Sequence, residues 1–194
     1  MALPTDGELL EQWRAGDAAS GQSLFSRYFD SVYRFFDTKC AGEADELVQS
    51  TFFACLRAKD SFRGDASFRT YLFTIARHEL HRVLREHRRD ERLDFDVSSV
   101  LELVSTPATK IGRNQEHQRV VEVLRQLPVE SQTLLELYYW EDLEVGALAE
   151  IFDAPAVTIR SRLHRARGQL RELMAKDAKL AGEDPEAWAR RNRA

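Results

Sequence analysis

Hydrophobic residues recur at helical spacing in short stretches of this chain, and polar or glycine-containing breaks separate the stretches. Thr5 and Glu8 form a capping box that predicts a short first helix, which ends at Gly16. Longer helices are expected over about residues 18–38, 43–59 and 67–89. The helix over 43–59 is expected to bury Val48, Phe52, Cys55 and Leu56. Because no segment has a convincing strand pattern, the chain is predicted to be all-α.

The periodic pattern is lost between Asp90 and about Glu116, where Asp, Ser, Thr and Pro residues dominate. This composition is typical of a flexible linker that contains at most one short helical turn. Helical spacing then returns, and Pro128 closes one helix and opens the next. We therefore predict two small helical domains joined by a flexible linker. A polar tail with one tryptophan, Trp188, follows them as either a frayed extension or a short docking helix.

The segment from Leu143 to Arg167 has the pattern of a helix-turn-helix. An apolar stripe over 145–152 predicts its first helix. Asp153 tolerates left-handed backbone and Pro155 prevents the first helix from continuing, so a tight turn is expected here. A longer helix follows. Its apolar stripe consists of Ile159, Leu163, Ala166, Leu170 and Leu173.

Polar and cationic side chains cover the other face of this second helix. They are Arg160, Ser161, His164 and Arg165, with Arg162, Arg167 and Arg171 at the flanks. No acidic residue lies between Thr158 and Arg171. Concentrating like charges on a small helix is costly, so a polyanion such as DNA is the expected partner. The alternative is the solvated face of a helical bundle, although acidic residues usually lie among the arginines of such a face.

A second candidate nucleic-acid site lies earlier in the chain. Residues 60–68 form a glycine-centred loop with Phe62 and Phe68 near its ends, and a basic helix follows it. Rings that stack on bases, next to arginines that hold the backbone, are typical of single-stranded nucleic-acid binding. The spacing is equally consistent with Phe62 and Phe68 as core anchors of the loop.

Composition narrows the functional classes. The net charge is −4, so a DNA-binding protein of this composition must separate basic faces from acidic ones, and the acidic faces indicate a protein partner as well. Cys40 and Cys55 form no CxxC pair and predict neither a disulfide nor a metal site. His78 and His81 stand at i, i+3, whereas the zinc motif HExxH requires i, i+4, so both are expected to be surface histidines.

No glycine-rich phosphate loop, nucleophile–base pairing or metal cluster is recognisable, so we expect no enzyme, no catalytic residue and no cofactor. No apolar run approaches the length of a membrane span, and the N-terminus lacks the hydrophobic stretch of a signal peptide. A cytoplasmic location is therefore expected.

Two separate motifs resemble one known family. The segment FRGDASFRTYLFTIAR at 62–77, with DELVQSTF at 45–52 upstream, resembles region 2 of the extracytoplasmic-function (ECF) sigma factors of the sigma-70 family. Residues 127–167 resemble region 4 of that family, most clearly in TIRSRLHRAR. The resemblance implies region 2 at 1–91, a linker at 92–115, region 4 at 116–176 and a tail at 177–194. Ser50, Tyr71 and His78 depart from the usual pattern, as do Asp153 and Val157 in the turn.

The resemblance implies a bacterial initiation factor that binds core RNA polymerase and reads two promoter elements. The residues implied for the −35 element are Thr158, Arg160, Ser161, Arg162, His164, Arg165 and Arg167. Those implied for capture and melting of the −10 element are Arg63, Gly64, Asp65, Ser67, Phe68, Arg69, Tyr71, Arg77, His78, Arg82 and Arg85. Those implied for docking on the polymerase are Asp45, Glu46, Gln49 and Phe52.

Other hypotheses explain less of the chain. A stand-alone helix-turn-helix regulator accounts for residues 143–167 but leaves the FRGDASF loop without a role. A protein-interaction adaptor without DNA binding does not explain the arginine face. Proteins of the resembled family are commonly held inactive by an anti-sigma factor, so such a partner is also expected.

Overall fold

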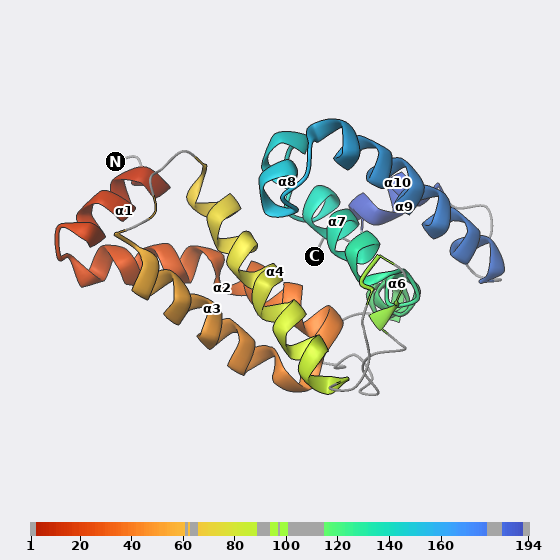
Figure 1. Ribbon diagram of the computed structural model, residues 1–194, viewed down its shortest axis with the longest axis horizontal. Helices are drawn as coiled ribbons and strands as arrows, with labels where there is room; N and C mark the ends of the chain where they lie inside the picture. The colour runs from red at the N-terminus through yellow and green to blue at the C-terminus, as the bar shows by residue number, and fades with distance from the viewer. Residues whose placement is uncertain are drawn as a thin grey trace.

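The computed structural model describes residues 3–60, 62, 66–88, 94–96, 98–100, 115–177 and 184–191. Within these ranges every regular element is helical, and Figure 1 shows the helices gathered into two groups. The prediction of an all-α chain with two small helical domains is confirmed. In the described residues, no helix combines the length and apolarity needed to cross a bilayer.

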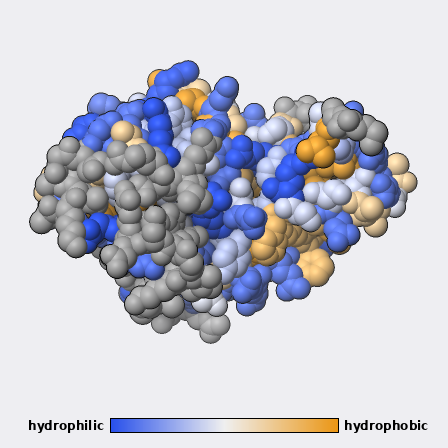
Figure 2. Space-filling view, turned by 180° about the vertical axis from the view of Figure 1, so that it is seen from behind, coloured by the Kyte–Doolittle hydropathy of each residue, from blue (hydrophilic) through white to orange (hydrophobic). Residues whose placement is uncertain are grey.

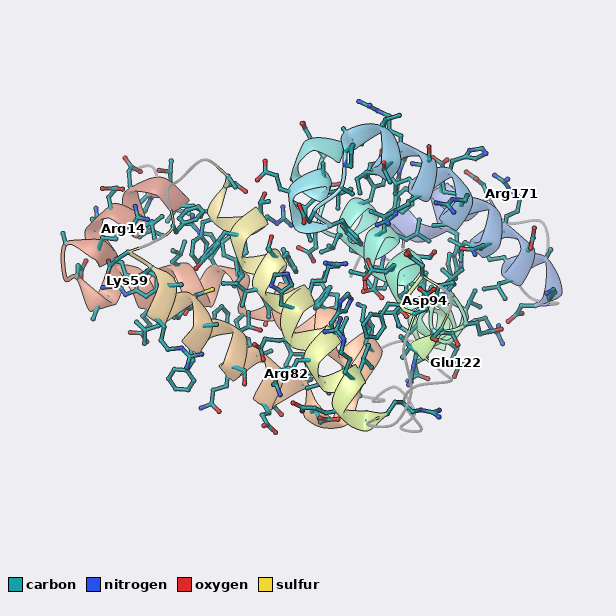
Figure 3. The ribbon with its side chains drawn as sticks, viewed as in Figure 1. Arg14, Lys59, Arg82, Asp94, Glu122 and Arg171 are labelled. Carbon is teal, nitrogen blue, oxygen red and sulfur yellow. The ribbon has the colours of Figure 1, made fainter. Side chains whose placement is uncertain are left out.

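The first group packs four α-helices and one short 3-10 turn around an aromatic-rich core. They are α1 (Asp6–Arg14), α2 (Ala18–Cys40), η1 (Ala41–Glu43), α3 (Ala44–Ala58) and α4 (Phe68–His87). The predicted capping box opens α1, because Thr5 accepts a hydrogen bond from the backbone of Glu8 and the Glu8 carboxylate accepts one in return. Arg14 donates to the backbone oxygen of Lys59 at 3.0 Å, which ties α1 to the end of α3 (Figure 3).

The second group contains the helix-turn-helix. Its elements are α6 (Gln115–Leu124), α7 (Val129–Tyr139), α8 (Val145–Ile151), α9 (Ala156–Lys176) and α10 (Pro185–Arg191). Asp153 has a φ of 47°, in the left-handed region that the turn was predicted to require. The apolar stripe of α9 faces inward, with Ile159, Leu163 and Ala166 all buried. The tail forms a docking helix, since Trp188 of α10 is only 1% exposed.

The two groups contact each other mainly through α4 and α8, with α7 close by. A buried ion pair between Lys39 of α2 and Glu136 of α7 joins them, and the Thr38 hydroxyl also donates to Glu136. A short described piece of the predicted linker contributes to the contact, because Phe95 and Val100 are both buried.

Two expectations about side-chain burial are wrong. Leu56 was expected in the core, but it is 43% exposed on the outer face of α3. His81 was expected on the surface, but it is buried beneath the second group. Helical spacing identifies an apolar face without showing whether a neighbouring helix covers it. Figure 2 shows hydrophobic surface over the half of the molecule that α1, α2 and α3 form.

Candidate nucleic-acid and protein interfaces

The α9 face carries four side chains that point into solvent together. Arg160, Ser161, His164 and Arg165 are all exposed, on the side of α9 opposite its buried stripe. Within the described residues of α9, the first acidic side chain is that of Glu172, near the C-terminal end. An exposed helix face of this kind has the dimensions and the hydrogen-bond donors to enter a DNA major groove.

The other three predicted −35 residues are less accessible. Thr158 is half-buried in the first turn of α9. Arg162 lies with its guanidinium 3.8 Å from the carboxylate of Asp96, which belongs to the predicted linker. Arg167 donates to the hydroxyl of Tyr139 at 2.8 Å, and its guanidinium lies 3.6 Å from the Glu186 carboxylate of α10. Arg162 and Arg167 therefore already hold anionic or polar partners inside the chain.

The start of α4 contains several predicted −10 residues. Arg63, Gly64 and Asp65 lie outside the described residues. Ser67 caps the helix by accepting a hydrogen bond from the backbone of Thr70 at 3.0 Å. The Phe68 ring is buried in the core and lies 5.8 Å from the Tyr28 ring, so it anchors the helix. Tyr71 stacks on Phe62 at 4.5 Å, and both rings remain partly accessible.

Two of the predicted −10 arginines face the second group of helices. Arg69 lies 2.6 Å from the Glu141 carboxylate, and Arg77 lies 2.9 Å from that of Glu130. The Arg77 guanidinium also sits over the Phe152 ring, 4.8 Å from its centroid. These contacts were missed at the sequence level, because ion pairs between residues far apart in sequence leave no periodic signal.

The remaining −10 residues on α4 are accessible. Arg82 is held by Glu79 and Glu86 of the same helix, at 3.0 and 2.9 Å, and Figure 3 shows it on the side of α4 away from the second group. Arg85 is exposed, with its guanidinium 5.3 Å from the centroid of the Phe95 ring. His78 is exposed as well, and partial desolvation together with the positive charge of Arg77 lowers its pKa.

All four residues predicted to dock on polymerase line one open groove. Asp45, Glu46, Gln49 and Phe52 share this groove of about 650 Å³ between α2 and α3. Its floor is apolar and includes exposed rings of Phe29 and Phe53, which are 45% and 53% accessible. Neither Phe29 nor Phe53 is among the residues predicted to dock on polymerase. The adjacent aromatic pair Phe52 and Phe53 was the available signal, because neighbouring side chains point about 100° apart around a helix axis and one of the two can lie outside the core.

Comparisons with known proteins agree with the two-part organisation. Residues 24–90 match the family described as Sigma-70 region 2, and residues 117–170 match Sigma-70 region 4. An ECF RNA polymerase sigma-E factor of Haemophilus influenzae is 30% identical over 174 residues, which cover 84% of this chain and 92% of that protein. The ECF RNA polymerase sigma-E factor of Escherichia coli (strain K12) is 32% identical over 173 residues, covering 84% and 91%.

The chain belongs to the ECF sigma factors. It is an alternative sigma factor, a protein of transcription initiation. Solved structures agree on the fold. CnrH in complex with the cytosolic domain of CnrY superposes with a TM-score of 0.65 at 23% identity and covers 88% of this chain and 97% of that one. The sigma factor RpoE of Bartonella quintana, bound to the anti-sigma factor NepR, gives 0.63 at 22% identity and covers 80% and 97%.

Proposed function

We propose that this sigma factor directs core RNA polymerase to its promoters through three separate surfaces. The α9 face reads the −35 element, the α4 surface captures the −10 element, and the groove between α2 and α3 docks on the polymerase. The proposal is supported by where the three surfaces lie in the two matched regions. The groove and the α4 surface lie within residues 24–90, which match region 2, and the exposed α9 face lies within residues 117–170, which match region 4. A stand-alone regulator would need only the α9 face.

The α9 face reads duplex DNA by direct contact. Arg160 and Arg165 donate to guanine in the major groove, and each good bidentate contact is worth about 1–3 kcal/mol of discrimination. Ser161 and His164 lie on the same exposed face and add donors or acceptors. Arg162 and Arg167 hold phosphates, which fix the register without reading sequence. Thr158 donates to a phosphate at the helix start.

The α4 surface captures the −10 element as single-stranded DNA. Arg63, Gly64, Asp65 and Ser67 contribute to capture of an extruded base, whose unstacking costs a few kcal/mol. Phe68 supports this end of α4 from the core. Tyr71 offers a ring for stacking. His78 contributes to base preference. The arginines grip the backbone of the opened strand; they are Arg69, Arg77, Arg82 and Arg85.

The groove between α2 and α3 binds a helical element of the polymerase. Its apolar floor and acidic rim suit an amphipathic partner with basic side chains at the edge of an apolar face. Asp45 and Glu46 supply the charge, while Phe52 and Phe53 supply the apolar contact. The chain acts in the cytoplasm, without enzymatic activity of its own, and an anti-sigma factor holds it inactive.

Run-off transcription with purified core polymerase and genomic promoter fragments tests this function. We expect promoter-dependent transcripts only when the protein is added, together with co-purification of the protein and core. Phe53→Asp should weaken core binding about ten-fold, because it places a charge on the apolar floor of the groove. The matched control is Leu3→Asp, since Leu3 is an exposed apolar residue outside the residues that line the groove. The absence of any core-dependent transcript would falsify the proposal.

A further inference from the structure

A ring from the predicted linker occupies the α4 surface. Phe95 stacks on the His81 imidazole with ring centroids 4.2 Å apart, and the Arg85 guanidinium lies 5.3 Å from the Phe95 centroid. Only 7% of Phe95 is exposed. A flat ring against an imidazole and a guanidinium is the arrangement in which proteins hold an unpaired nucleic-acid base.

Carboxylates from the second group of helices lie on the same surface. Glu130 of α7 places one oxygen 2.9 Å from Arg77 and 2.7 Å from the Nε2 atom of His81. Glu141 lies 2.6 Å from Arg69, nearer the start of α4. Charge-assisted contacts of this kind are the ones that arginine makes with phosphates. The α4 surface therefore carries a ring and anionic groups together, as it would with a bound strand.

The ring and the nearest carboxylate are joined through the backbone. The backbone N–H of Glu130 donates to the carbonyl oxygen of Phe95 at 3.0 Å, and that of Val129 donates to the carbonyl oxygen of Ser98 at 3.0 Å. The next residue, Asp96, extends to Arg162 of α9. One short segment thus connects both candidate DNA surfaces, and its bonds to the start of α7 hold it to the second group of helices, so it leaves α4 when that group does.

We propose that Phe95, Glu130 and Glu141 act as an internal substitute for single-stranded DNA on α4. The inference rests on the proposed −10 role of α4 and adds how access to that surface is controlled. In the free protein the substitute excludes DNA from Arg69 and Arg77. A −10 strand binds only after the two groups of helices separate. Its apparent affinity is therefore the affinity of the open form multiplied by the fraction of molecules that are open.

Two substitutions weaken the substitute without touching the cations. Phe95→Ala removes the ring, and Glu130→Gln keeps the shape of the side chain while removing its charge. Binding of the full-length variants to a fluorescein-labelled 20-nucleotide oligo(dT) strand is measured by anisotropy, without polymerase. Each variant should bind about ten-fold more tightly than the original chain, because the open fraction rises. Glu122→Gln is the matched control, since Glu122 is exposed on α6.

The result that overturns the inference is an affinity in both variants that is unchanged or lower, with thermal unfolding showing that at least one variant is folded. An equal gain in the Glu122→Gln control would also overturn it, since the effect would then be general electrostatics. Core co-purification and run-off transcription are measured on the same variants. If the internal substitute is wrong but the sigma function is right, these variants still bind core and support transcription, and only the gain in strand binding is missing.

Discussion

The two candidate DNA surfaces differ in how accessible they are. On α9 the side chains of Arg160, His164 and Arg165 extend into solvent. On α4 the side chains of Arg69 and Arg77 end on carboxylates of the other group of helices. Both surfaces are cationic, so charge alone does not explain the difference. Their positions in the fold explain it, because α4 packs against α8 and meets the Glu130 side chain of α7, while the exposed face of α9 lies on the outside.

Because of this difference, the two surfaces require different conditions to bind DNA. The exposed side chains of Arg160, Ser161, His164 and Arg165 can meet duplex DNA without separation of the two groups of helices. The α4 surface must first lose its contacts with Glu130 and Glu141. A ligand can shift such an equilibrium only by binding the open form more tightly than the closed one. The groove between α2 and α3 is accessible in the closed arrangement, so docking on polymerase supplies that free energy only through further contacts that the open form alone can make.

The largest expected effect comes from the buried ion pair that joins the two groups. Lys39→Met leaves the Glu136 carboxylate buried without its cation, which should disfavour the closed arrangement by about 3–5 kcal/mol. Separation of the groups would return Glu136 to water. We therefore expect a larger radius of gyration in small-angle scattering. The double variant Lys39→Met with Glu136→Leu should regain the compact form, and a compact Lys39→Met single variant would contradict the prediction.

A smaller and different effect is expected on α9. Arg160→Ala removes an exposed side chain, so the free energy of unfolding should change by less than about 0.5 kcal/mol. Promoter-dependent transcription should fall by the equivalent of about 1–3 kcal/mol, because a base contact is lost. The radius of gyration should stay constant, in contrast to Lys39→Met. Arg171→Ala, near the C-terminal end of α9, is the control and should transcribe almost normally. Equal losses in both variants would mean that α9 contributes only general charge.

The sequence predicted the open surface much better than the covered one. The α9 face was identified because its apolar stripe and its cations are both local, at helical spacing within one segment. The turn before it was identified because Asp153 and Pro155 restrict the backbone in known ways. The contacts between the two groups of helices pair Arg77 with Glu130 and Lys39 with Glu136, and the partners are distant in sequence. Pairing at that separation depends on how two helical groups dock, and no spacing rule reports it.

The smallest expected effect is a pH dependence of the contacts that Glu130 makes with α4. Burial of Glu130 acts to raise its pKa, but the contacts with His81 and Arg77 outweigh burial and lower the pKa below the usual value of 4.5. A carboxylate with a lowered pKa in the folded state adds stability above its unfolded pKa and loses it as the pH falls through its folded pKa. The contribution of Glu130 is thus complete at pH 7 and is lost progressively below about pH 4.5.

Comparison of the original chain with Glu130→Gln isolates that contribution. Between pH 7 and pH 4 the original chain should loosen more than the variant, because the variant has no carboxylate to protonate at this position. Small-angle scattering and oligo(dT) binding report the loosening at α4, while the exposed α9 face should show no matching change. If both proteins respond to pH identically, Glu130 does not stabilise the closed arrangement of the two groups. The contrast between the two DNA surfaces must then rest on Lys39, Glu136 and the apolar contacts alone.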